Sequence, residues 1–460
     1  MKVTFQPLGL VLLAVLGLSG CMMLGPDYRE PAAPVQPDWI EVEEALIETM
    51  PPVTAMWWQT AFRDPIIDQL VATALAQNLS LRAAGLRVLQ ARQQLLIAIG
   101  NQYPQQQQLG GQAGVEGLFS SSSEELYDLG FNLSWEADVW GRFRRQIESA
   151  SAALDASLAG YDGIMVSLIS EVAQTYLLIR TTQKRLAVAR DNLRYQAEGV
   201  WITTAKYEAG EVSALDVEQA QSLFYNTQAS VAVFEQSLQQ FKNALAILLG
   251  QPPYDMNDVL LKPRSIPTVA PEVAIGMPQD LIRRRPDIRQ AERQLASQSA
   301  QIGFAITDLY PQFGISGSVG TSVSTAAGFQ FSDLFNSDTS GYNLFGVFQW
   351  NIFNYGRLKN NVRLQDAVFQ QLLEDYRQTV LQAQGEVENA IVAFLKSQQQ
   401  LASLWLAAEA AQRAVDISTE QYQDGLVEFN TVISTLRSLT AQQDQFASAK
   451  GTVAANLIEI

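Results

Sequence analysis

The chain of 460 residues contains no histidine and a single cysteine, Cys21. Without histidine, a Ser-His-Asp arrangement and His-ligated zinc or haem are excluded, and one cysteine leaves no intramolecular disulfide. Carboxylate pairs or a Ser-Lys arrangement remain open as catalysts, but no GxSxG, P-loop or dinucleotide-binding glycine motif stands out. Nothing positive supports an enzyme, a cofactor or a high-affinity soft-metal site.

Positive charge is also scarce. The 31 Lys and Arg residues are outnumbered by 47 Asp and Glu residues, which gives a formal net charge of −16. This balance argues against binding to nucleic acid or to an anionic membrane surface through a basic patch. A cationic partner or cargo is compatible with it, although an acidic solvated surface is the simpler interpretation.

Long apolar runs are missing as well, apart from a short one near the start. Lys2 precedes the apolar stretch 8–18, which is too short to span a bilayer and leads into the sequence Leu-Ser-Gly-Cys at 18–21. Residues 1–20 are therefore predicted to be a signal peptide with a lipobox at 18–21, and Cys21 to carry diacylglycerol and an N-acyl chain. The alternative is an ordinary signal peptide followed by a coincidental cysteine. Met22 stands where bacterial lipoproteins retained at the inner membrane have aspartate, so we expect the outer membrane.

What is present is a duplication. From Tyr127 onward, residues i and i+215 match in long register, for example Tyr127 with Tyr342 and Gly141 with Gly356. Upstream the offset is 207, so the second copy carries eight extra residues between its Tyr-Pro pair and Tyr342. A duplicated unit of this kind usually builds one quasi-symmetric body. We assign repeat 1 to 65–250 and repeat 2 to 279–460.

Each copy is predicted to contain one β-hairpin, at 103–139 and 310–354. Apolar residues alternate with polar ones from Leu129 onward, and the polar positions are Asn132, Ser134, Glu136 and Asp138. Strands of this type without a transmembrane helix are typical of outer-membrane barrels, and the alternative is a soluble four-stranded sheet. Four strands cannot close a barrel, so two or more chains must share one, and three chains would supply twelve strands.

The rest of each copy is predicted to be helical: 65–100, 143–206 and 213–249 in the first, and 279–307, 358–421 and 428–460 in the second. A seven-residue repeat of apolar positions, such as Val172, Ile179 and Leu186, runs along the long helices and predicts coiled-coil packing. Gly210 and Gly425 follow their ends and predict turns. Residues 251–278 are proline-rich and read as a linker, and 21–64 as an extended N-terminal segment.

Several short motifs resemble one known family. They are Gly25-Pro26-Asp27-Tyr28 after Cys21, Trp57-Trp58 with Asp64-Pro65, Arg285-Pro286-Asp287, and Tyr207-x-x-Gly210-x-x-Ser213-x-Leu215-Asp216. Together they resemble the lipoprotein branch of the TolC-like outer-membrane efflux factors. The resemblance implies an α+β membrane protein in which a coiled-coil α-barrel continues into a transmembrane β-barrel, twelve-stranded in a homotrimer. It also implies a periplasmic adaptor, an inner-membrane pump of the resistance-nodulation-division type, and outer-membrane lipid as partners.

On this resemblance the helix turns form the periplasmic tip that meets the adaptor, and the matching positions are Tyr207, Gly210, Ser213, Asp216, Tyr422 and Gly425. The family commonly closes its tunnel near the tip with an acidic residue one turn before an arginine. Here those positions are Ser434 and Arg437, so the acid is missing and a looser gate is expected. Carboxylates that could pair with Arg437 instead are Asp424, Glu428, Glu211 and Asp216.

The resulting expectation is a passive exit duct, with Asn132, Ser134, Glu136 and Asp138 in the barrel lumen. Two other roles stay open, which are the outer-membrane duct of a type I-like secretion system and a lipid-anchored structural spacer without a conducting lumen. A carboxylate-based envelope hydrolase would need a cleft that neither repeat offers. The sequence does not indicate the cargo.

Overall fold

Long helices and one antiparallel sheet make up most of the computed structural model, which describes residues 22–32, 35, 47–48, 56–117, 119, 123–253, 260, 265–267, 273–274 and 283–460. The predicted signal peptide, Cys21 and most of the linker at 251–278 lie outside these residues. The helices are α2 (Trp57–Phe62), α3 (Pro65–Gln77), α4 (Leu79–Gly100), α5 (Arg142–Glu208), α6 (Ala214–Leu248), α9 (Pro286–Thr307), α10 (Arg357–Gln423) and α11 (Phe429–Glu459). The strands are β1 (Ile47–Glu48), β2 (Gln106–Glu116), β3 (Glu124–Ala137), β4 (Val273–Ala274), β5 (Gln312–Ser324) and β6 (Ser340–Gln349).

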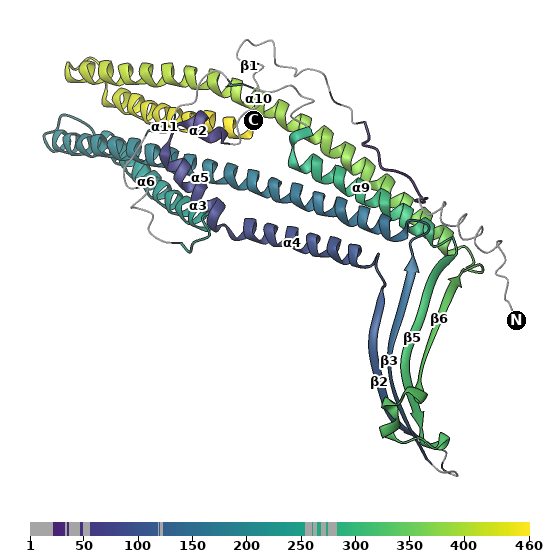
Figure 1. Cartoon of the computed structure of the whole chain (residues 1–460). Helices are drawn as coiled ribbons and strands as arrows, with labels where there is room; N and C mark the ends of the chain where they lie inside the picture. Colours follow the sequence, from purple (N-terminus) through teal and green to yellow (C-terminus); the bar gives the residue numbers. More distant parts are fainter. Residues whose placement is uncertain are drawn as a thin grey trace. The chain divides into compact units, whose positions relative to one another are not determined.

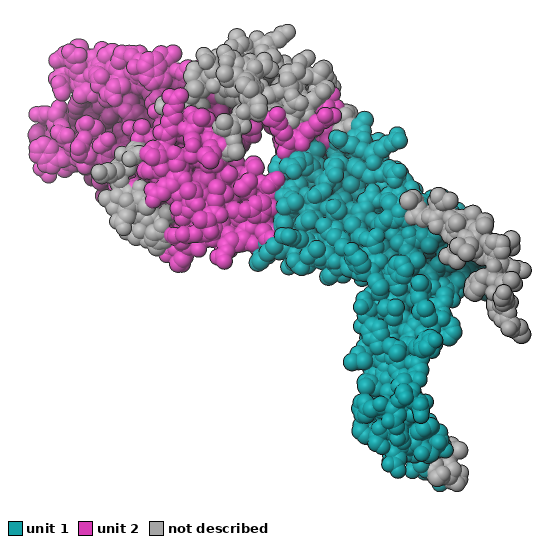
Figure 2. Space-filling view, in the orientation of Figure 1, with its two compact units in different colours: residues 1–33, 86–160, 286–379 teal, residues 34–85, 161–285, 380–460 magenta. Residues whose placement is uncertain are grey.

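The chain divides into two compact units, and each takes residues from both copies of the repeat (Figure 2). Unit 1 lies within Met1–Ala33, Leu86–Gly160 and Pro286–Thr379. Unit 2 lies within Pro34–Gly85, Tyr161–Arg285 and Val380–Ile460. The copies are therefore not independent domains, because neither unit is built from one copy alone.

The sheet of unit 1 has the order β2-β3-β5-β6, with every neighbouring pair antiparallel. Its strands are long and curved and lie side by side (Figure 1). Cross-strand partners share a face, so the continuous register carries the alternation of one strand across all four. Leu129, Phe131, Leu133 and Trp135 share one face of β3, which we call the outward face, and Asn132 and Ser134 share the polar face.

One row of the polar face consists only of glycine. Gly110 pairs with Gly130, Gly130 with Gly320, and Gly320 with Gly341. The backbones approach closely there, since a Cβ atom added to Gly320 would lie 2.6 Å from the Cα atom of Gly130. Glycine in a strand interior often marks such an approach or a bend.

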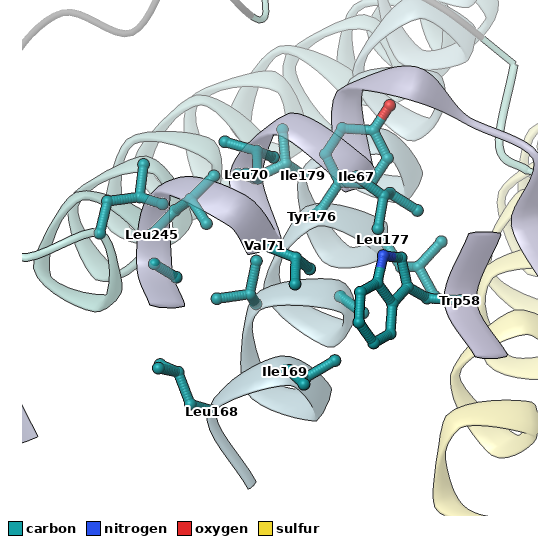
Figure 3. Packing of buried hydrophobic residues seen from close by; sticks show 14 of the residues in the cluster. Trp58, Ile67, Leu70, Val71, Leu168, Ile169, Tyr176, Leu177, Ile179 and Leu245 are labelled. Carbon is teal, nitrogen blue, oxygen red and sulfur yellow. The ribbon is translucent and has the colours of Figure 1, made fainter. Parts of the chain in front are cut away.

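The largest buried cluster of unit 2 packs α2, α3 and the end of α6 against α5 (Figure 3). Tyr176 of α5 is completely buried there, and its hydroxyl donates to the carboxylate of Asp64 at 2.6 Å. Burial, together with this hydrogen bond, raises the pKa of Tyr176 to about 12. Asp64 also accepts from the backbone of Ile66 and so caps α3, which accounts for the Asp-Pro motif.

The predicted single helix at 65–100 is wrong, because α3 and α4 are separate helices. Asn78 lies between them in an extended conformation, and its side chain accepts from the backbone N–H of Leu81 at 2.9 Å. Its amide also donates to the carbonyl of Leu248, 170 residues away at the end of α6. The break is thus made by a tertiary contact at the point where α6 meets the α3–α4 junction.

The long helices follow the predicted heptads. Val172, Ile179 and Leu186 of α5 are buried, as are Val387 and Phe394 of α10. Among the described residues, α5 alone contains an 18-residue stretch long and apolar enough to cross a membrane. Seven residues of α5 between Leu168 and Ile179 belong to the buried cluster of unit 2, and 28% of the apolar stretch is buried.

Candidate functional site

The two tips, where α5 turns into α6 and α10 into α11, end their long helices in the same way. Gly210 has φ of +77°, and Gly425 has φ of +73°. At the first tip the N–H of Gly210 donates to Tyr207 and that of Glu211 to Lys206, and the second tip repeats this pattern from Gly425 and Leu426. This is the Schellman motif, in which the left-handed residue lets the chain reverse.

The next helices begin differently. Ser213 and Asp216 form a capping box at the start of α6, where the Asp216 carboxylate accepts from the backbone and hydroxyl of Ser213 at 2.9 and 2.7 Å. Asp216 is therefore engaged locally, and its expected pairing with Arg437 stays a prediction. The matching N-cap of α11 is Glu428, whose side chain makes no capping hydrogen bond.

The predicted tip residues are not all presented to solvent. Tyr207 is about half exposed, whereas Tyr422 packs between Lys206, 4.6 Å from its ring centroid, and Phe429, 5.3 Å away. Sequence reasoning missed Leu426, which directly follows Gly425 and is 72% exposed. An apolar residue just after the helix-ending glycine was the available signal.

A cavity of about 1280 Å³ lies inside unit 2 next to the tips, lined by α5, α6, α10, α11 and residues 265–266. Gln196 of α5 lines it and is 5% exposed, yet neither its amide nitrogen nor its oxygen has a hydrogen-bond partner among the described residues. An unpaired buried amide costs free energy. The cavity thus offers room to an incoming group, beside an amide whose two polar atoms are buried.

The predicted gate residues lie on α11 and at the second tip. Ser434, Arg437, Asp424 and Glu428 are all exposed. Arg437 forms no ion pair with any residue that the structure describes. Deeper in unit 2, α5 and α11 are joined by Arg185, which makes two hydrogen bonds of 2.7 and 2.8 Å to the carboxylate of Asp444. This bidentate contact raises the pKa of Arg185 and keeps its charge in place.

The predicted lumen residues divide into two groups. Asn132 and Ser134 lie within β3 on the polar face, where Asn132 belongs to a row of four polar residues with Gln108, Ser318 and Asn343. Glu136 lies near the end of the same strand. Asp138 does not belong to the strand, because its carboxylate accepts from the backbone N–H groups of Phe143 and Arg144 and pairs with the Arg144 guanidinium. It caps α5 from a position just beyond the end of the strand, so its expected place in the lumen stays a prediction.

The Gly25-Pro26-Asp27-Tyr28 motif docks onto the start of α5, in a segment that we call the strap (residues 22–32). Arg145 is 1% exposed and donates to the carbonyls of Leu24 and Gly25 at 2.9 and 3.1 Å. It also pairs with Asp27 at 3.0 Å and with Glu148 at 2.7 Å. The backbone N–H of Leu24 donates to the carbonyl of Trp140, between β3 and α5.

Two further contacts fasten the strap within unit 1. Gly25 lies against Gly303 of α9 so closely that a Cβ atom on Gly25 would be 2.3 Å from the Gly303 Cα atom. The Tyr28 hydroxyl donates to Glu292 at 2.8 Å, and burial together with this carboxylate raises the pKa of Tyr28. Glycine at both positions of the crossing is a steric requirement.

The sequence and the structure were compared with those of known proteins. The family model "Outer membrane efflux protein" matches residues 70–251 and 277–460, which is most of the chain. The chain belongs to this family. Efflux proteins of this family are outer-membrane ducts, and the present one is the outer-membrane duct of an efflux system that extends into the periplasm.

Similar proteins match this chain over most of its length. Nodulation protein T of Rhizobium leguminosarum bv. trifolii is 31% identical over 437 residues, covering 94% of this chain and 91% of the relative. The probable outer membrane lipoprotein SilC of Salmonella typhimurium is 28% identical over 429 residues, covering 93% and 91%. The solved structure of the outer-membrane channel OprN matches with a TM-score of 0.87 at 31% identity, covering 95% and 98%.

Proposed function

We propose that this chain is one third of a homotrimeric duct whose barrel closes by pairing β2 of one chain with β6 of the next. β2 and β6 are the two edges of the sheet, with 11 and 10 residues. In a bilayer each unsatisfied backbone group costs several kcal/mol, so open edges do not occur there. Two edges of nearly equal length support a closed ring of repeated sheets, and three sheets of four strands exceed the minimum of about eight.

The polar face of the sheet would line the lumen and the outward face would meet lipid. Asn132, Ser134 and Glu136 belong to the lining, whereas outward residues such as Leu109 and Leu344 are 72% and 69% exposed. Large apolar side chains facing water in this number would be costly. The duct itself performs no chemistry in this proposal and conducts its cargo passively.

The tips would receive the hairpins of a periplasmic adaptor, which in turn docks an inner-membrane pump of the resistance-nodulation-division type. The exposed Tyr207 and Leu426 supply apolar contact, and the cavity beside Gln196 supplies space. Helix-in-groove recognition uses these features. Gly210, Gly425 and the Ser213–Asp216 capping box hold the turns in shape.

Cys21 would hold the duct in the outer-membrane lipid through its acyl chains. It lies three residues before Leu24, whose backbone is bonded to Trp140. At about 3.3–3.6 Å per residue, the acylated cysteine is within roughly 10 Å of that contact. The similarity to a lipoprotein supports this part of the proposal.

The test of the proposed assembly is the mass of the detergent-solubilised, outer-membrane-derived particle by native mass spectrometry. We expect three chains of 50.7 kDa, less the signal peptide and plus lipid. A stable monomer would contradict the shared barrel. The edges β2 and β6 would then need some other covering.

The gate would form from Arg437 and its neighbours, held more loosely than in relatives with an acid at the position of Ser434. Both side chains are exposed, and the nearby candidates Asp424 and Glu428 form no ion pair with Arg437 in the described residues. A restored carboxylate would add a charge-assisted hydrogen bond of about 1.5–3 kcal/mol per chain.

Ser434→Asp is therefore expected to lower the single-channel conductance and the open fraction of the duct in planar bilayers. Thr452→Asp, at an exposed position 18 residues further along the same helix and therefore about 27 Å away, is the control and should leave both unchanged. Equal conductance in the wild type and Ser434→Asp would refute a gate at this position.

A further inference from the structure

The segment that joins β5 and β6 contains local secondary structure. It contains three short 3-10 helices, η2 (Thr325–Ala327), η3 (Phe331–Phe335) and η4 (Ser337–Thr339). Only the second copy of the repeat carries the eight extra residues in this region. We call residues 325–339 the foot.

The foot packs on the outward face of the sheet. The Phe331 ring contacts the ring of Tyr127, with centroids 5.0 Å apart. Val323, the cross-strand partner of Tyr127, is only 2% exposed, and Thr321 bonds to Thr339 at 3.0 Å. Tyr127, Val323 and Thr321 all share the face of Leu129 and Phe131, so the foot lies on the side that meets lipid in the proposed duct.

The polar groups of the foot are largely satisfied inside it. The Asp333 carboxylate accepts from the Gln330 backbone at 2.8 Å and from the Asn336 amide at 3.0 Å. The Thr339 hydroxyl contacts the Asp333 carbonyl at 2.7 Å. A segment whose backbone is satisfied locally can approach an apolar medium at much lower cost than an irregular loop.

Its apolar side chains remain uncovered. Phe329, Phe331 and Phe335 are 38%, 56% and 73% exposed, whereas Leu334 is buried beneath them. Exposed aromatic clusters of this kind mark an interaction surface. The surface is continuous with the outward face through Tyr127, and that continuity identifies its partner.

The position of the foot along the strands is consistent with a contact between the foot and lipid. At the other end of the outward face, Trp135 and Trp350 donate their indole N–H groups to the carbonyls of Gln102 and Leu309. Tyr127 lies eight residues from Trp135 in β3. At ~3.3 Å per residue and a tilt of about 40°, the two levels are roughly 20 Å apart, close to the ~25 Å apolar band between the aromatic girdles of a barrel.

We propose that the foot is a membrane-interface anchor, which inserts Phe331 and Phe335 into the outer leaflet and completes the aromatic girdle on the far side of the membrane. Its partner is the lipid surface itself, at the level where acyl chains meet head groups. Each chain contributes one foot, from the second repeat. This inference rests on the proposed barrel, because it requires the outward face to meet lipid.

The test is spin-label accessibility of Phe335→Cys in vesicles of phosphatidylcholine and phosphatidylglycerol, 3:1. Nitroxide collisions with oxygen report lipid, and collisions with a water-soluble nickel chelate report water. Leu344→Cys on the outward face is the lipid reference and Asn343→Cys on the polar face is the water reference. The unsubstituted protein, labelled in parallel, gives the background from Cys21.

We expect the label at 335 to collide with oxygen several-fold more than the label at 343, as the label at 344 does. Collisions with nickel at the level of 343 would mean that the foot stands in water, and low collisions with both reagents would mean that a second chain covers it. Either result overturns the anchor. If the labels at 343 and 344 do not differ from each other, the proposed barrel itself fails, so the two failures are distinguishable.

Discussion

Arg145→Ala is expected to release the strap from α5 and to expose it to trypsin at Arg29. The guanidinium makes charge-assisted hydrogen bonds with two carbonyls and two carboxylates while being 1% exposed. Each such bond is worth about 1.5–3 kcal/mol, and the substitution also leaves a cavity. A loss of about 3 kcal/mol of docking free energy raises the open population roughly 150-fold, and cleavage of a transiently opened segment follows that population.

The measurement is the rate of loss of the N-terminal fragment that precedes the cut at Arg29, which appears as a mass shift of the remaining chain. The duplication supplies a matched control, because Asn360 occupies the position of Arg145 in the second copy and is exposed. Trypsin should cleave the Asn360→Ala variant at the same rate as the wild type. If Arg145→Ala is also cut no faster than the wild type, the strap is held by its glycine crossing and Tyr28 rather than by Arg145.

Gly451→Val is expected to separate α11 from α5. A Cβ atom at position 451 would lie 2.1 Å from the Thr181 Oγ1 atom and 3.0 Å from its Cβ atom. Thr181 is itself buried, at 8% exposure, so it has little space to move. Overpacking a tight contact costs about 1–3 kcal/mol and occasionally more, and we expect the upper end of this range, since the valine branches add two further carbons.

The measurement is thermal unfolding of the solubilised protein by far-ultraviolet circular dichroism. Gly385 of α10 is the control, because nothing lies within 4 Å of a Cβ atom placed there. Valine is a somewhat better helix former than glycine, so Gly385→Val should leave the Tm unchanged or raise it slightly. The double variant Gly451→Val, Thr181→Gly should regain part of the Tm that Gly451→Val loses. Equal Tm values for the two valine variants would show that the contact between α5 and α11 tolerates expansion.

The elements that local pattern controls were predictable from the sequence. Alternation over Leu129 to Trp135 identified both faces of β3, because successive side chains of a strand point to opposite sides. Glycine at 210 and 425 located the tips, because the left-handed conformation that reverses the chain favours that residue. The long helices end within two residues of the predicted bounds for the same reason.

The features that depend on distant residues were not predictable in this way. The break at Asn78 is stabilised by Leu248, and the burial of Arg145 is made possible by carbonyls about 120 residues earlier. Asp138 continues the alternation of β3, yet it serves as a cap because α5 begins four residues later. The proposed gate at Ser434 and Arg437 would involve other copies of the chain, which the pattern of a single chain does not reveal.

The glycine row of the sheet bears on what the duct can discriminate. In a trimer each chain would contribute one such row of Gly110, Gly130, Gly320 and Gly341. Because the strands of a barrel tilt and their register is staggered, each row would climb obliquely across its own third of the wall. Along such a row cargo would meet only peptide groups whose hydrogen bonds are already used between strands, so this part of the wall offers no side chain that could select one class of compound over another.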